Sequence, residues 1–154
     1  MTTQIIKDVY NNPYYAIDVL VDSVDNNGTS FNELLKKFLE LVPNAVDFNK
    51  KLLKRNNNAY HITILNVPEY NIVLKSNEIN ELPTIKIDDI VFKGIGSITE
   101  GDMVTYYVVV DSLTINLLID VYNIKQKDLH ITMGFSDKDL FKKRKNVTNV
   151  FTIE

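Results

Sequence analysis

The sequence predicts an α+β domain made of two small antiparallel sheets with flanking helices. The order strand, helix, strand occurs twice, and each copy ends on a strand in which a histidine is followed two residues later by a threonine. Two β-rich runs joined by a short turn are typical of a hairpin, and its second strand opens the second copy. With 154 residues, 45% of them hydrophobic, the chain can form one domain with a sizeable core, and we assign residues 1–154 to it.

The first copy begins with an apolar run at residues 14–23, which predicts a strand. After a turn, Thr29 or Ser30 caps a helix, and Glu33 is placed to complete a capping box with Ser30. The helix ends before Pro43. Its apolar stripe consists of Phe31, Leu34, Leu35, Phe38, Leu39 and Val42.

A second short helix is predicted over residues 45–53, and a polar run leads from it into the first histidine strand. The Asn-rich connection after this strand has one short apolar piece, at residues 72–74, and receives no assignment. Residues 85–87 are read as a short strand.

The second copy begins within the hairpin, whose strands are predicted at residues 91–98 and 104–110. Residues 112–124 have helical spacing, and the first of them is a favourable N-cap. After the second histidine strand come a basic segment at residues 138–145 and a terminal strand at 147–153.

Both histidines of the chain lie in the same tripeptide, His-Ile-Thr. Side chains alternate between the two faces of a strand, so His61 shares a face with Thr63, and His130 with Thr132. By the same rule Phe135 points away from His130. From composition alone, Ile-Thr follows a second histidine on the order of once in a few hundred cases, so the duplication indicates a function.

The paired motifs resemble those of the two-histidine (2H) phosphoesterase superfamily. The strings YHITI at residues 60–64 and DLHITMGF at 128–135 look most like its swiss-army-knife RNA-repair-like branch, which includes the phage anti-CBASS nucleases. The histidines are 130 − 61 = 69 residues apart, as a lobe-sized repeat would give. The resemblance implies a bilobal fold in which the histidine strands lie side by side around a central cleft.

Two imidazoles and two hydroxyls on one surface suit phosphodiester cleavage. Histidine has an ordinary pKa of about 6.5, so one ring can take a proton from the nucleophile while the other gives one to the leaving oxygen. The two threonines can donate to the phosphoryl oxygens. The sequence leaves open which histidine is the base, and whether water or a ribose 2′-hydroxyl attacks.

Composition excludes several other chemistries. The absence of cysteine removes disulfides, thiolate metal sites and cysteine nucleophiles, so we expect no metal and no cofactor. A formal net charge of −3 disfavours long duplex DNA and favours a small phosphorylated ligand in a local pocket. No membrane span or signal peptide is recognisable, which predicts a cytoplasmic protein, in the host cytoplasm if the source is viral.

Substrate contacts are predicted at the rim of the cleft. Tyr14 is one of several tyrosines that could stack on a base, whereas Tyr60 faces away from the adjacent histidine. Lys142, Lys143 and Arg144 belong to a basic run that either steers phosphate or forms a solvated surface.

Three functions fit these residues. The first is metal-independent hydrolysis of a small, cyclic oligonucleotide signal, as in phage evasion of CBASS immunity, which the resemblance implies. The second is RNA end processing at 2′,3′-cyclic phosphates or 2′-5′ linkages. The third is a non-catalytic module that sequesters a cyclic or linear nucleotide.

Overall fold

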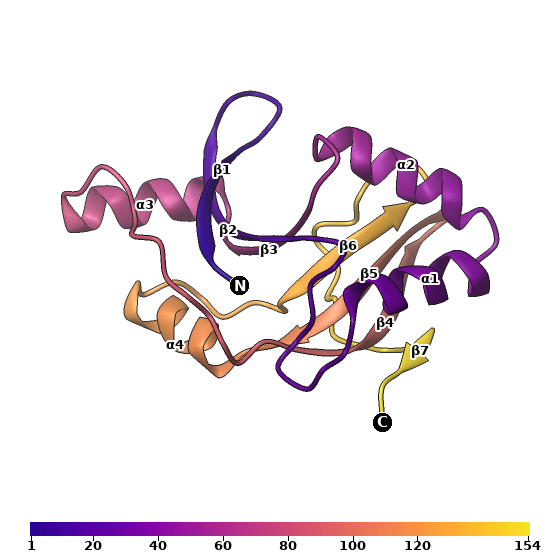
Figure 1. Cartoon of the computed structure of the whole chain (residues 1–154). Coiled ribbons are helices and arrows are strands. Elements are labelled where there is room, and N and C mark those ends of the chain that lie inside the picture. Colours follow the sequence, from indigo (N-terminus) through magenta and orange to yellow (C-terminus); the bar gives the residue numbers. More distant parts are fainter.

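The computed structural model describes residues 1–154 and shows a seven-stranded antiparallel sheet with four helices (Figure 1). The strands are β1 (Thr3–Lys7), β2 (Pro13–Val19), β3 (Tyr60–Leu65), β4 (Val91–Glu100), β5 (Met103–Asp111), β6 (His130–Phe135) and β7 (Phe151–Thr152). The helices are α1 (Phe31–Leu41), α2 (Ala45–Arg55), α3 (Val67–Asn77) and α4 (Leu113–Val121). The strand order is β1-β2-β3-β6-β5-β4-β7, so the two histidine strands are neighbours in the middle of the sheet.

The two sheets expected from the sequence are joined into one. The antiparallel pairing of β3 with β6, in which Ile62 lies opposite Ile131, connects three strands of the first half to four strands of the second. This pairing consists of a single register pair, whereas β4 and β5 pair along their whole length. The repeat therefore survives as two halves of one sheet.

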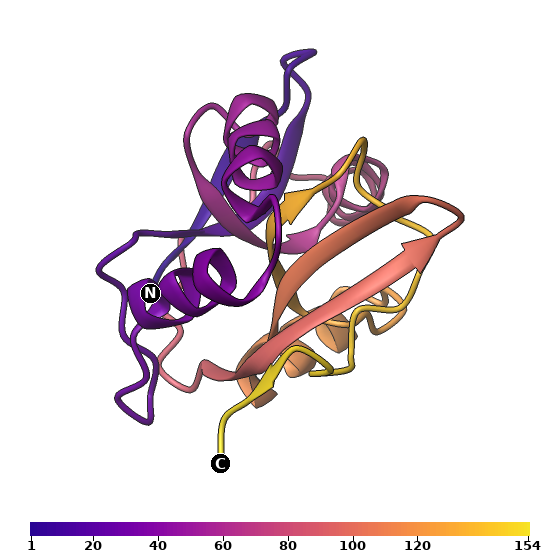
Figure 2. The same cartoon turned by 90° about the vertical axis from the view of Figure 1, so that its right-hand side faces the viewer.

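The hydrophobic core lies on the face of the sheet that carries Ile62 and Ile131. Side chains from all four helices belong to the same buried cluster as these two residues. The Phe31 ring of α1, for example, packs edge-on against Tyr60 of β3 with a centroid separation of 5.0 Å. Figures 1 and 2 show α2 lying beside β6 on this side. Because the helices cover this face, the histidines are left on the other one.

The segment that follows β6 folds back over the histidine face of the second half. The amide of Leu140 donates to the hydroxyl of Thr105 on β5 over 3.1 Å. Further along, a Cβ on Gly96 of β4 would lie 1.9 Å from the carbonyl oxygen of Val147, so only glycine permits this close approach. The segment brings residues 136–150 next to the second histidine motif.

Most predicted elements are confirmed, with shifted ends. Ser30 caps α1 by accepting from the Glu33 amide, and Ser112 caps α4. The first predicted strand ends earlier, at Val19, because Leu20 and Val21 leave the sheet and are exposed. The hairpin of β4 and β5 forms as expected.

Four local predictions are wrong or incomplete. Strand β1 and helix α3 were not predicted, although α3 begins with a full capping box between Asn66 and Glu69. Residues 85–87 form only an isolated bridge through Lys86, and the terminal strand shrinks to Phe151–Thr152. None of the four helices combines the length and apolar composition that crossing a membrane requires.

Candidate active site

The pairing of β3 with β6 brings the two His-Thr motifs together on one face. Continuing the register from Ile62 and Ile131 by one residue in each direction sets His61 opposite Thr132 and Thr63 opposite His130. Side chains directly opposite in an antiparallel pair have Cβ atoms about 4.5–5.5 Å apart. Each histidine therefore lies next to the threonine of the other motif.

His130 is held by its own strand. Its Nδ1 atom lies 2.7 Å from the carbonyl oxygen of Asp128, which can only accept, so Nδ1 carries the proton. In the neutral ring Nε2 is then the free basic atom. Burial lowers the pKa of His130, and the nearby Lys145 lowers it further, against the opposing effects of the Asp128 carbonyl and of the neighbouring carboxylates.

His61 has different neighbours, all from the first half of the chain. Its Nδ1 atom lies 3.0 Å from the Tyr14 hydroxyl, and its Nε2 atom lies 3.9 Å from the carboxylate of Asp18, its cross-strand partner on β2. Burial lowers the pKa of His61, Asp18 raises it, and Arg55 lowers it. Of the predicted substrate residues, Tyr14 is the one that contacts a histidine.

Arg55, which the sequence analysis did not single out, lies at the end of α2 and reaches the second motif. Its guanidinium donates to the buried carboxylate of Asp139 over 2.8 Å and lies 5.2 Å from the centroid of the Phe135 ring. It is close enough to influence the pKa of both His61 and Tyr14. No local pattern marks it, because its carboxylate partner Asp139 lies 84 residues away along the chain.

Close packing of α2 on β6 positions this arginine. A Cβ on Gly134 would lie 2.9 Å from the backbone of Phe48 and 3.0 Å from that of Asn49, so glycine is needed for the helix to approach. The Asn49 amide then donates to the carbonyl of Met133 and to the hydroxyl of Tyr60, each over 2.8 Å. These contacts fix α2 against both histidine strands.

Asp139 links the arginine to the second motif. It accepts from Thr132 over 3.4 Å, and its other oxygen lies 3.5 Å from Nζ of Lys145, whose side chain is also buried. Burial opposes ionisation of Asp139, but Lys145 and Arg55 outweigh it and hold its pKa below the ordinary value. The network therefore presents a charged, hydrogen-bonded support beneath Thr132.

The residues of the predicted basic run differ in their exposure and in their partners. Lys142 and Lys143 are exposed, and Arg144 forms a two-pronged ion pair with Asp128 at 3.0 and 2.9 Å. Lys145, in contrast, points inward and donates to the carbonyl of Leu140 over 2.9 Å. None of the three predicted basic residues forms a hydrogen bond or an ion pair with either histidine.

The orientation predicted for Phe135 is wrong. An irregularity between Tyr106 and Tyr107 shifts the pairing, so that Tyr107 lies opposite Thr132 while Thr105 lies opposite Phe135. Because residues 105 and 107 share a face of β5, Phe135 and Thr132 share a face of β6. One additional residue in β6 therefore returns Phe135 to the histidine side.

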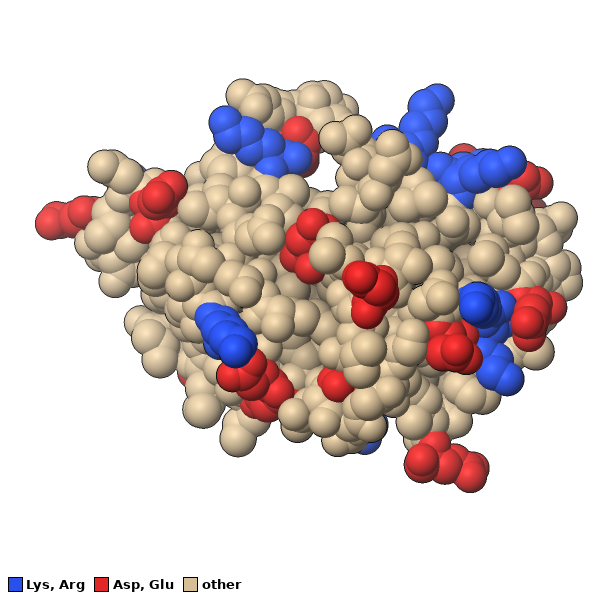
Figure 3. Space-filling view, viewed as in Figure 1, with Lys and Arg blue, Asp and Glu red and all other residues tan.

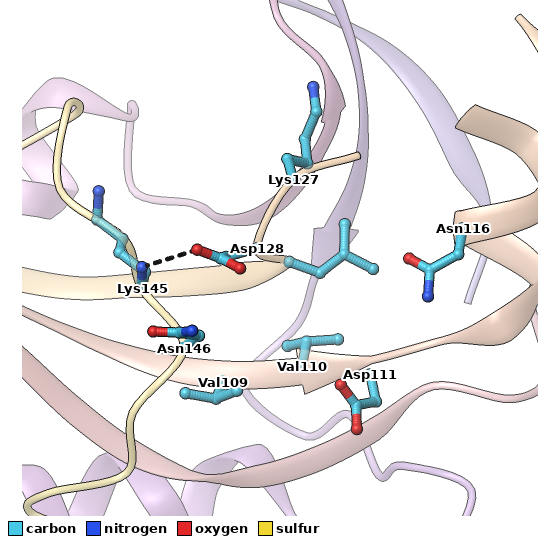
Figure 4. A pocket seen from close by; sticks show the side chains of 9 residues that line it. Val109, Val110, Asp111, Asn116, Lys127, Asp128, Lys145 and Asn146 are labelled. Carbon is cyan, nitrogen blue, oxygen red and sulfur yellow. Dashed lines mark hydrogen bonds between the residues drawn. The ribbon is translucent and has the colours of Figure 1, made fainter. Parts of the chain in front are cut away.

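A pocket of about 590 Å³ adjoins the site at this end of β6. It is lined by Lys51, Lys54, Arg55, Phe135, Asp137, Lys138, Asp139 and Phe141. A smaller one, of about 160 Å³, lies between the end of β5, Asp128, Lys145 and Asn116 of α4 (Figure 4). In the view of Figure 3 basic and acidic side chains are interspersed, without a continuous basic band.

These features define a class of protein. Two His-x-Thr strands are paired at the centre of an antiparallel sheet, with both imidazoles on the face opposite the helices, and this is the arrangement expected of a two-histidine phosphoesterase. Residues 27–141, well over half of the chain, match the family described as Swiss Army Knife, 2H phosphoesterase domain. The chain belongs to this family and is a phosphodiesterase, a hydrolase with a small nucleic-acid substrate. No curated protein and no solved structure matches it.

Proposed function

We propose that the protein hydrolyses a phosphodiester bond in a small, cyclic oligonucleotide, with His61 and His130 transferring the protons. The observation that carries this proposal is the register of β3 and β6, which sets each histidine opposite the threonine of the other motif. A phosphate lying over this pair of strands meets two imidazoles and two hydroxyl donors at once. Thr63 donates to one non-bridging oxygen, and Thr132 donates to another by turning its single hydroxyl proton away from Asp139.

The surroundings of the two rings favour His130 as the base. Its Nδ1 proton is committed to a carbonyl, Lys145 is nearby, and burial disfavours the charged ring, so Nε2 is free to accept a proton. Burial lowers the pKa of His61 as well, but the carboxylate of Asp18, 3.9 Å from its Nε2 atom, opposes this shift and stabilises the imidazolium. His61 is therefore the acid that protonates the leaving oxygen.

Arg55 supplies the fixed positive charge of this site. It is held by Asp139 on one side and influences His61 on the other, which puts it near the developing charge on the phosphoryl group. The reaction needs no cofactor, because acid, base and charge stabilisation all come from side chains. Water or an adjacent ribose 2′-hydroxyl serves as the nucleophile, according to the substrate.

A small cyclic ligand is supported by charge, by pocket size and by resemblance. The chain is acidic overall, whereas cations gather around one pocket of nucleotide dimensions. The motif strings resemble those of phage anti-CBASS nucleases, so a cyclic oligonucleotide signal in the cytoplasm of an infected host is the first candidate substrate.

The test is a cleavage assay with excess chelator. The panel contains cyclic di- and trinucleotides, 2′-5′ oligoadenylate and nucleoside 2′,3′-cyclic phosphates, with the His61→Ala and His130→Ala variants as controls. Cleavage of cyclic oligonucleotides by the wild type alone supports the proposal. Cleavage restricted to 2′-5′ or 2′,3′-cyclic linkages would instead indicate RNA end processing, and tight binding without cleavage would indicate a sequestering module.

A further inference from the structure

The larger pocket continues the histidine site along the strand. The two share Asp139, which accepts from Thr132 on one side and pairs with Arg55 in the pocket wall on the other. Phe135 follows Thr132 by three residues, or about 10 Å of extended chain, and lies on the same face. An oligonucleotide whose scissile phosphate lies at the histidines therefore extends into this pocket.

The pocket has an excess of positive charge in a chain whose formal net charge is −3. Lys51, Lys54 and Arg55 come from one side of α2, at the three- and four-residue spacing that brings helix side chains together, and Lys138 comes from the segment after β6. Of the two carboxylates in the lining, Asp139 is already paired with Arg55. Three lysines then face one remaining carboxylate, that of Asp137, and Lys51, which donates to the Ser136 carbonyl, keeps further donors; this positive excess suits a phosphate group.

Phe141 gives the same pocket an exposed aromatic ring. It is 77% exposed, although large apolar side chains are normally buried. Cations hold the ring, since the Arg55 guanidinium lies 5.7 Å and Nζ of Lys145 lies 6.0 Å from its centroid. A ring that is positioned in advance and open to solvent is a stacking platform for a nucleobase.

We propose that this pocket binds the nucleotide next to the scissile phosphate, with its base stacked on Phe141 and its own phosphate held by Lys51 and Lys54. The inference rests on the proposed function and narrows its substrate class. The preferred ligand has at least two nucleotides and two phosphates, whereas a nucleoside 2′,3′-cyclic phosphate fills the histidine site and leaves the pocket empty.

Binding is measured apart from turnover, in the His61→Ala/His130→Ala background, with cyclic di-AMP and 2′,3′-cyclic AMP as calorimetric probes. We expect Phe141→Ala, and separately Lys51→Gln/Lys54→Gln, to raise the Kd of cyclic di-AMP about tenfold or more. The Kd of 2′,3′-cyclic AMP stays the same.

Two controls accompany these variants. Phe141→Tyr keeps the ring and should keep the affinity. Lys36→Gln/Lys75→Gln makes the same change of charge at exposed positions that do not line the pocket, and should affect neither ligand.

An unchanged Kd for cyclic di-AMP, equal weakening of both probes, or failure of cyclic di-AMP to bind would each overturn the subsite. The proposed activity is judged separately, from cleavage by the wild type. Turnover of a diester that Phe141→Ala does not impair would leave the activity standing without the subsite.

Discussion

His61 and His130 share a tripeptide but not an environment. His61 has a tyrosine hydroxyl and the carboxylate of Asp18 beside it, whereas His130 has a carbonyl and the ammonium of Lys145. The proposed difference between acid and base therefore rests on residues of neighbouring strands and of the C-terminal segment, outside the motifs themselves.

Removing either imidazole should abolish turnover and leave the fold intact. We expect His61→Ala and His130→Ala to lower kcat by about 100-fold or more, the usual loss for a general acid or base. Thr63→Val and Thr132→Val should lower kcat less, because each removes one hydrogen-bond donor and keeps the β-branched shape. The measurements are steady-state kinetics and thermal unfolding; near-wild-type kcat in either alanine variant contradicts the two-histidine mechanism.

Arg55 should matter about as much as a histidine. Loss of its charge in Arg55→Met removes a preorganised stabiliser of the phosphoryl oxygens, and we expect kcat/KM to fall about 100-fold. Arg55→Lys retains the positive charge but not the planar guanidinium, so its kcat/KM should lie between those of the wild type and Arg55→Met. Equal kcat/KM for Arg55→Met and the wild type would place Arg55 outside the chemistry.

Some residues of the candidate site can be predicted from the sequence, and others cannot, because their contacts depend on the folded chain. The His-x-Thr pairs can be read from local spacing because strand alternation alone puts each pair on one face. Arg55 and Asp139 contact each other across 84 residues of chain, which no local pattern reports, and Lys145 pairs with Asp139 only because the segment after β6 folds inward.

At the scale of elements, one irregularity in the pairing of β6 with β5 changes what the site contains. Strict alternation directs Phe135 toward the helices, but the extra residue returns it to the histidine face. Helix α3 shows the opposite case, because its capping box between Asn66 and Glu69 is visible in the sequence even though the apolar spacing around it is weak. The strong helical periodicity of apolar residues in α1, in contrast, predicts that helix correctly.

Because α2 packs closely on β6, we expect that adding one methyl group at Gly134 destabilises the fold. In Gly134→Ala the new Cβ meets the backbone of Phe48 and Asn49, which cannot rotate away, so α2 must move and carry Arg55 with it. We expect a loss of about 1–3 kcal/mol of unfolding free energy, measured by urea denaturation, together with reduced kcat/KM. Wild-type values for both would mean that α2 moves aside without disturbing Arg55.

At the scale of the whole molecule, both histidine pKa values lie below the ordinary 6.5 because of burial. The unfolded chain therefore binds more protons than the native one as pH falls below about 6.5, and stability declines in that range. We expect a slope of at most about 1.4 kcal/mol per pH unit for each histidine, seen in urea unfolding at pH 5 to 8. His61→Ala/His130→Ala should flatten it; a wild type that is equally stable across this range contradicts the burial argument.

The same shifts shape the activity profile. Since kcat/KM reports the free enzyme, its dependence on pH should be bell-shaped and centred at or below about pH 6.5. Activity should survive excess chelator, because both proton transfers belong to side chains. Loss of activity with chelator and rescue by magnesium, manganese or zinc would require carboxylate ligands such as Asp18, Asp22 or Asp111 and would overturn the acid–base assignment.

The single register pair between β3 and β6 has a mechanical consequence. So short a strand contact leaves the two halves of the sheet to be braced by helices that cross between them: α2, from the first half, packs on β6, and α4, from the second, contacts β3. The distance between the two imidazoles therefore depends on how α2 and α4 pack in the core. We expect substitutions at Leu52 of α2 or Ile119 of α4, which are fully buried, to change the distance between the imidazoles and with it the rate of the reaction.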